Sequence, residues 1–143
     1  MTEQLAKAYK LSKNFSLYEM LYSQTALEKG LLHEQFDVTE KEILNLKRLC
    51  DNILQPLRDH MKAPIRVGSG YRSLAINNLV GGSKTSDHMK AMAADIQCTN
   101  MPKAFAYLKT LKFRQLIQYG DPFRFIHVSY DEFDNKCQLL KFD

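Results

Sequence analysis

The sequence predicts an α+β fold in which N-terminal helices pack on a small, mostly antiparallel sheet. Up to Met61 the apolar residues recur at helical spacing, whereas after Pro64 several short segments alternate at strand spacing. No internal repeat or linker-like segment separates the two halves. Because 143 residues can bury a core without help from disulfides, we expect residues 1–143 to form one domain.

Two capping boxes mark helix starts in the first half. Segments 16–19 (SLYE) and 39–42 (TEKE) each place a hydroxyl at the helix start and a carboxylate three residues later, which satisfies two free backbone N–H groups. We expect the first helix to run from the first box to a stop at Gly30. Pro56 should kink or break the second helix. The apolar positions of that helix have a period near 3.6: Ile43, Leu46, Cys50, Ile53, Leu54, Leu57 and Met61.

The pattern changes to alternation and turn chemistry after Pro64. The expected elements are a strand at 65–69, a helix at 74–80, a strand at 93–98, a helix at 102–111 and strands at 115–119, 125–130 and 137–142. Turn-forming residues separate the last three segments, so we expect them to form a terminal β meander.

Composition and charge restrict the partners. The net charge of +4 suits an anionic partner such as nucleic acid or a bacterial wall, but no basic stripe with interleaved aromatics predicts a nucleic-acid site. Residues 1–15 lack the apolar core of an export signal, and no window approaches the roughly 18 apolar residues of a membrane span. We therefore expect synthesis in the cytoplasm and no membrane partner.

Three irregularly spaced cysteines indicate reduced thiols: Cys50, Cys98 and Cys137.

The segment SDHMKAMAAD contains two candidate metal ligands, His88 and Asp95. A third, His127, lies in the expected strand FIHVSY on a polar face that is opposite Ile126 and Val128. A catalytic zinc commonly takes three protein ligands and leaves one position to water. Spacing alone leaves two interpretations open: a turn whose charges face water, or one metal site. The remaining histidines, His33 and His60, are expected on the surface.

Residues 69–96, SGYRSLAINNLVGGSKTSDHMKAMAADI, resemble the zinc D-alanyl-D-alanine carboxypeptidase family. The family motif is SxHxxGxAxD, preceded by SGYRS, an asparagine and Val-Gly-Gly. The matching residues are Ser86, His88, Ala93, Asp95, Asn78 and Val80 to Gly82. Segment 126–129 is similar to the strand of the third ligand, and the opening FSLYEMLYSQTALEKG and the helix LKRLCDNILQPLRD resemble the small phage and prophage branch.

The resemblance implies a Hedgehog/D,D-peptidase type of fold and zinc held by His88, Asp95 and His127. It implies a metallopeptidase that hydrolyses peptidoglycan stem peptides with a metal-activated water, as a D,D-carboxypeptidase or an endopeptidase. Arg72 matches the family arginine that grips a substrate carboxylate or the developing oxyanion. Ser86 would orient substrate or a metal ligand.

The general base is left open. Relatives carry an acid three positions before the third ligand, where this chain has Arg124, or in the preceding strand, where it has Gln118. Asp121, in the turn GDPFRF, is the nearest acid before the strand and is our first candidate, although Asp before Pro commonly serves local hydrogen bonding. Asp87 is the second candidate.

Other positions allow two interpretations. Ala91 replaces the motif glycine, which would cost about 1 kcal/mol if that position needs a positive φ. Tyr71 is a candidate for substrate binding, but Tyr71 and Tyr130 could equally belong to the core or the rim. Alternation places Cys98 on the face opposite Asp95, which favours a small buried side chain.

The expected biology is a monomeric endolysin or prophage wall hydrolase that reaches peptidoglycan after lysis or through a phage lysis system. One alternative is a wall-binding or phage structural module that has kept the fold and the metal but lost its base. A nucleic-acid-binding domain is the second alternative.

Overall fold

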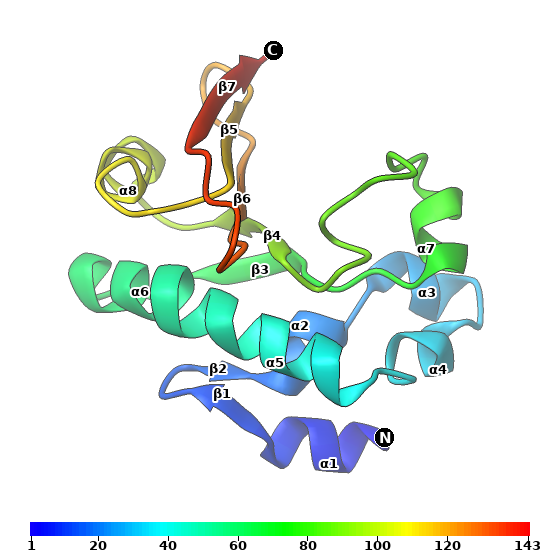
Figure 1. The fold of residues 1–143 in the computed structure, drawn as a ribbon. Coiled ribbons are helices and arrows are strands. Elements are labelled where there is room, and N and C mark those ends of the chain that lie inside the picture. The colour runs from blue at the N-terminus through cyan, green and yellow to red at the C-terminus, as the bar shows by residue number, and fades with distance from the viewer.

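The computed structural model describes residues 1–143 as helices around a five-stranded sheet, with a separate two-stranded hairpin (Figure 1). The helices are α1 (Glu3–Ala8), α2 (Leu17–Leu21), α3 (Gln24–Glu28), α4 (Leu32–Gln35), α5 (Glu40–Leu49), η1 (Cys50–Leu54), α6 (Gln55–Met61), α7 (Leu74–Leu79) and α8 (Met101–Leu108). The strands are β1 (Lys10–Ser12), β2 (Phe15–Ser16), β3 (Arg66–Ser69), β4 (Ala93–Gln97), β5 (Gln115–Tyr119), β6 (Phe125–Ser129) and β7 (Gln138–Phe142).

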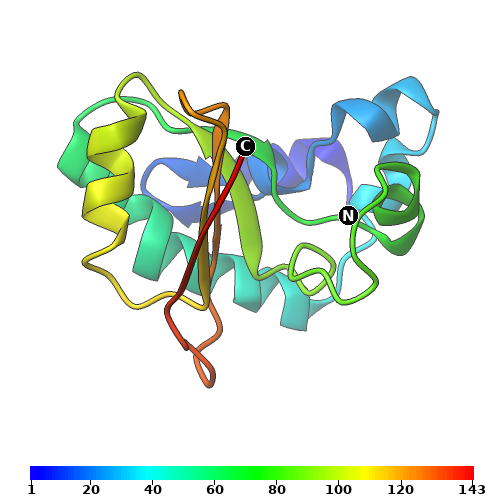
Figure 2. The same ribbon diagram turned by 90° about the horizontal axis from the view of Figure 1, so that it is seen from above.

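The long helix formed by α5, η1 and α6 runs beneath the sheet, with α1 and the β1–β2 hairpin on its other side (Figure 1). Seen from above, α8 lies on one side of the strands and α7 on the other (Figure 2). A cluster of 25 buried residues joins these layers. The α+β prediction is confirmed, and no helix combines the length and apolar character needed to cross a bilayer.

Both predicted capping boxes are present, at Ser16 and at Thr39. The first helix is nevertheless shorter than predicted, because α2 ends at Leu21 and Tyr22 adopts an extended conformation. Ser23 then caps a new helix, α3, by accepting a hydrogen bond from the backbone of Ala26. The strong N-cap signal of the serine overrides helix continuation and turns the chain.

Pro56 does not end the second helix. The turn immediately before it, η1, is a π-helix, and the N–H of Gln55 bonds to the carbonyl of Cys50. A π turn shifts the hydrogen-bond register by one residue, so the missing N–H of proline is accommodated at the start of α6. The apolar face stays buried across the irregularity, with Ile53, Leu54 and Leu57 fully inaccessible.

The predicted terminal meander is wrong in its last connection. The sheet order is β3-β4-β6-β5-β7, and β7 pairs in parallel with β5 instead of following β6. Both edges of β6 are already occupied, by β4 and β5, so β7 cannot pair with β6, and it takes the outer edge of β5. Hydrogen bonds from Cys137 to Phe113 and from Gln138 to Arg114 start β7 beside the beginning of β5, which makes the pair parallel.

A fully buried amide connects the helices to the segment that follows β3. The Nε2 of Gln35 donates to the carbonyls of Leu21, at 2.9 Å, and Tyr71, at 2.7 Å. Its Oε1 accepts from the backbone N–H of Ser73 at 2.8 Å. One side chain thus fixes the backbone on both sides of Arg72.

Replacing Gln35 with Leu should lower the free energy of unfolding by about 2–4 kcal/mol, because buried backbone groups lose their partners. Chemical denaturation measures the change. Gln4→Leu, at an exposed helical position, is the matched control and should change stability by about 0.5 kcal/mol or less. Equal effects of the two substitutions would contradict this role of Gln35.

Candidate metal centre

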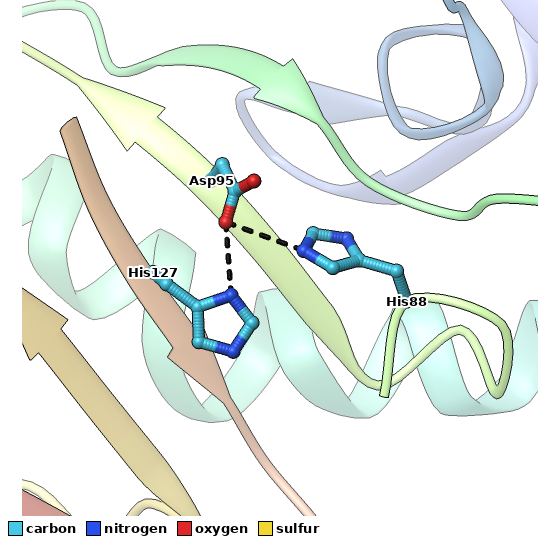
Figure 3. A group of neighbouring side chains, drawn as sticks. All are labelled: His88, Asp95 and His127. Carbon is cyan, nitrogen blue, oxygen red and sulfur yellow. Dashed lines mark hydrogen bonds and ion pairs between the residues drawn. The ribbon is translucent and has the colours of Figure 1, made fainter. Parts of the chain in front are cut away.

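His88, Asp95 and His127 meet on one face of the paired strands β4 and β6 (Figure 3). The antiparallel register places Asp95 directly opposite His127, and His88 reaches them from the loop between α7 and β4. Asp95 Oδ1 lies 3.2 Å from His88 Nε2 and 2.9 Å from His127 Nδ1. One atom from each residue lies within 4.8 Å of the others.

The loop that carries His88 folds tightly over the sheet. The backbone N–H of His88 donates to Ser86 Oγ at 3.2 Å, and the His88 carbonyl accepts from the backbone of Arg72 at 3.0 Å. Ala91 has a φ of 59°, the left-handed conformation for which the motif glycine would be suited. The small, fully buried side chains of Ala91 and Ala93 let the loop approach the strand closely.

A backbone carbonyl orients the His88 ring. Gly70 O lies 2.7 Å from His88 Nδ1, and since a carbonyl only accepts, Nδ1 carries the proton and Nε2 is directed at Asp95. Gly70 itself packs against α2, where a Cβ would lie 2.5 Å from the carbonyl oxygen of Met20. A glycine is therefore required where the end of β3, the helix and the histidine meet.

The partly buried carboxylate of Asp95 remains ionised. Burial alone raises the pKa of Asp95, but hydrogen bonds from His127 and His88 and the charges of these rings outweigh it, and the pKa lies well below its usual range. A metal ion would take the place of those ring protons, so its donor set would be one anionic carboxylate and two neutral imidazoles.

These residues fit a zinc ion. Two imidazole nitrogens and one carboxylate oxygen are common zinc ligands, and bonds of about 2.0–2.1 Å at tetrahedral angles separate neighbouring donor atoms by roughly 3.3 Å. The two separations from Asp95 Oδ1, 3.2 and 2.9 Å, are close to that value. The bond from His88 Nδ1 to Gly70 is the outer contact that metal-binding histidines usually make.

Arg72 lies beside the acid and is held in place by its neighbours. Its Nε donates to Ser69 Oγ at 3.2 Å, its Nη1 donates to Asn77 Oδ1 at 3.0 Å, and its Nη2 lies 3.9 Å from Asp95 Oδ2. Gly82 closes over this group, since a Cβ there would lie 2.1 Å from Asn77 Oδ1 and 2.7 Å from Arg72 Nη1. Burial lowers the pKa of Arg72, while Asp95 and Tyr119 act in the opposite direction.

The three potential ligands and Arg72 line one open cavity of about 380 Å³. Its wall is mostly polar, and Ser86 belongs to it. The other lining residues are Gly81, Gly82, Ser83, Gln115, Ile117, Tyr119 and Phe125. A substrate can thus reach the donor set from solvent.

The family model for Peptidase M15 matches residues 13–129, which include the whole candidate centre. The chain belongs to peptidase family M15. This confirms the resemblance to zinc D-Ala-D-Ala carboxypeptidases, a family of metallopeptidases that depend in general on zinc. A search of curated proteins found no match to the chain.

Two residues that the sequence suggested for this M15 peptidase site lie elsewhere. Tyr71 is buried in the hydrophobic core, because Gln35 holds its carbonyl inward, and its ring does not line the cavity. Asp121 is exposed in the turn after β5 and forms an ion pair with Lys141 at 2.9 Å. Neither side chain is placed to act on a substrate in the cavity.

The second candidate for the base, Asp87, and the two positions where relatives carry an acid also lie outside the cavity. Asp87 follows the cavity residue Ser86, but its carboxylate accepts from Arg114 Nε at 3.0 Å, and the residue lines a neighbouring pocket instead of this cavity. Gln118 points to the other face of β5 and donates to the carbonyl of Gly120. Arg124 is exposed.

Tyr119 is the residue of β5 that sequence reasoning missed. The register pairs Ile117 with His127, so alternation brings Gln115, Ile117 and Tyr119 to the cavity face and turns Gln118 away. The alternation of QLIQY separates the two faces of the strand. It identifies Tyr119 as a cavity residue only once Ile117 is known to pair with His127 of β6.

Ala91→Gly should change the free energy of unfolding by about 0.5 kcal/mol or less. Relief of the positive φ, about 1–2 kcal/mol, offsets the loss of a buried methyl, about 0.8 kcal/mol, and the greater freedom of glycine in the unfolded chain. The control is Ala104→Gly, also fully buried but inside α8, which should cost about 2 kcal/mol. Thermal or urea unfolding distinguishes the two, and equal losses would contradict strain at Ala91.

Proposed function

We propose that this M15 peptidase is a zinc enzyme that hydrolyses peptide bonds in peptidoglycan stem peptides, as a D-Ala-D-Ala carboxypeptidase or an endopeptidase. The observation that supports the proposal most is the convergence of His88 Nε2, Asp95 Oδ1 and His127 Nδ1 on the wall of a solvent-open cavity. Bound zinc would supply a water of lowered pKa and polarise the scissile carbonyl.

The remaining cavity residues have roles that suit such a substrate. Arg72 is a fixed cation beside the donor set, and a guanidinium matches the carboxylates that stem peptides carry. Ser86 Oγ accepts from the backbone of His88, which leaves its proton free to donate to a substrate oxygen.

We further propose that the protein acts as a monomer on the cell wall, in a phage or prophage lysis system, without a nucleic-acid or membrane partner. The similarity of segments 15–30 and 46–59 to the small phage branch supports this setting.

The purified protein should bind about one zinc ion per chain, and Asp95→Asn should weaken zinc binding at least about 100-fold because the anionic ligand is lost. Competition with a zinc indicator measures the affinity. Asp121→Asn, which removes an acid outside the cavity, is the matched control and should bind zinc like the wild type. A folded wild-type protein that takes up no zinc would refute the site.

One observation favours a second candidate function, a metal-containing module that binds the wall without cutting it. Asp95 is the only carboxylate that lines the cavity, and both histidines engage its Oδ1. A general base contributes typically about 10²–10⁴-fold to such reactions. Without a second acid, turnover is expected to be slow.

Incubation with purified peptidoglycan separates the two candidates. The proposed enzyme should release amino acid or soluble fragments with zinc present, and the release should stop with a chelator and in His127→Ala. Wall binding without any release over long incubation would favour the second candidate.

A further inference from the structure

A groove lies along α5 and shares no residue with the metal cavity. It consists of two adjoining cavities of about 280 and 420 Å³, which have Lys41, Asn45 and Met92 in common. Lys41, Asn45 and Arg48 recur at helical spacing, so one face of α5 forms its first wall. We call it the α5 groove, and its other residues are Thr39, Glu42, Lys90 and Tyr130 to Phe133.

The turn after β6 forms the second wall of the α5 groove. Arg48 Nη2 lies 3.0 Å from Glu132 Oε2, an ion pair that ties this turn to α5. Within the turn, the backbone N–H of Phe133 donates to Asp131 Oδ1 at 3.0 Å. Residues 130–133 follow the segment 13–129 that the family model matches, so membership of the family does not account for this wall.

Asn45, which lines both cavities, has an acceptor without a partner in the chain. The residue is only 8% exposed, and its Nδ2 donates to the carbonyl of Lys90 at 3.0 Å. No group of the chain donates to its Oδ1. Since buried polar atoms are nearly always hydrogen-bonded, this oxygen is suited to receive an N–H or O–H group of a ligand.

An exposed aromatic ring stands at the rim of the groove. Phe133 is 87% exposed, although hydrogen bonding fixes the turn that carries it. Tyr130 adds a second ring to the same wall. Aromatic side chains combined with a few polar groups are typical of sites for small organic ligands.

The charges of the α5 groove balance. Three cationic and three acidic side chains line it: Lys41, Arg48, Lys90, Glu42, Asp131 and Glu132. A polyanion such as nucleic acid, or a strongly acidic peptide, gains little from a wall without net charge. A neutral ligand that has both an apolar face and hydrogen-bonding groups fits this wall better.

We propose that the α5 groove binds a neutral saccharide that carries N-acetyl groups, the chemistry of the glycan strands in peptidoglycan. The C–H face of a sugar ring packs on Phe133, and an acetamido N–H donates to Asn45 Oδ1. The inference goes beyond the proposed function, because it requires neither zinc nor hydrolysis. Binding there would hold the protein on the wall while the metal cavity stays open to solvent.

Titration of the purified protein with soluble sugars, followed by NMR, tests the groove. The tetramer of N-acetylglucosamine should bind at least about 5-fold more tightly than cellotetraose, which has hydroxyls in place of the acetamido groups. Phe133→Ala, at an exposed position, should keep the fold and weaken binding of the N-acetylated tetramer about 5-fold to 10-fold. Leu5→Ala, at a position 60% exposed on α1 and outside the groove, is the matched control and should bind like the wild type.

A second variant tests the acceptor. Asn45→Leu should reduce the preference for the N-acetylated tetramer and leave binding of cellotetraose unchanged. If this variant does not fold, Phe133→Ala and the comparison of the two sugars still decide.

The proposal would be overturned by absence of binding, by equal affinity of the wild type for the two sugars, or by unchanged affinity in Phe133→Ala. Chemical-shift changes confined to the metal cavity would overturn it as well. Cleavage of peptidoglycan by the zinc-loaded protein is measured separately. Cleavage without sugar binding refutes the groove alone, whereas sugar binding without cleavage refutes the proposed enzyme and supports the groove.

Discussion

A single carboxylate oxygen organises the centre of this protein. Two imidazole nitrogens lie within hydrogen-bonding distance of Asp95 Oδ1. One belongs to His127 on the neighbouring strand, and the other to His88 in the loop after α7. The strand register sets one contact, and the hydrogen bond from His88 to Gly70 sets the other. Gly70 is fixed in turn by its approach to Met20, and Gln35 fixes the backbone around Arg72. The helical half of the chain therefore determines the geometry of a site whose main residues lie in the other half.

Local chemistry made much of this arrangement predictable. The capping boxes located two helix starts, and alternation in FIHVSY correctly put His127 on the face opposite Ile126 and Val128, which are fully buried. The ordered motif in segment 69–96 pointed to the M15 family, and it grouped His88 with Asp95 because both are fixed positions of one motif. These signals are local, because each lies within one contiguous segment of the chain.

The failures concern interactions between distant segments. Nothing in the local sequence shows that β4 and β5 occupy both edges of β6 or that β7 pairs with the outer edge of β5. Gln35 has the sequence context of an ordinary polar helical residue, although its three hydrogen bonds join α2 to the segment after β3. Sequence reasoning considered only Gln118 in this strand, as the position where relatives carry an acid, whereas its neighbour Tyr119 lines the cavity, and in a strand a shift of one position selects the opposite face.

The most direct test is zinc K-edge X-ray absorption of the zinc-loaded protein, because it reports the atoms bound to the metal without reference to activity. We predict a first shell of nitrogen and oxygen at about 2.0–2.1 Å with the outer-shell scattering of two imidazoles, from His88 and His127. A sulfur shell at about 2.3 Å, which would require a cysteine ligand, or a signal from fewer than two imidazoles would contradict the centre described above.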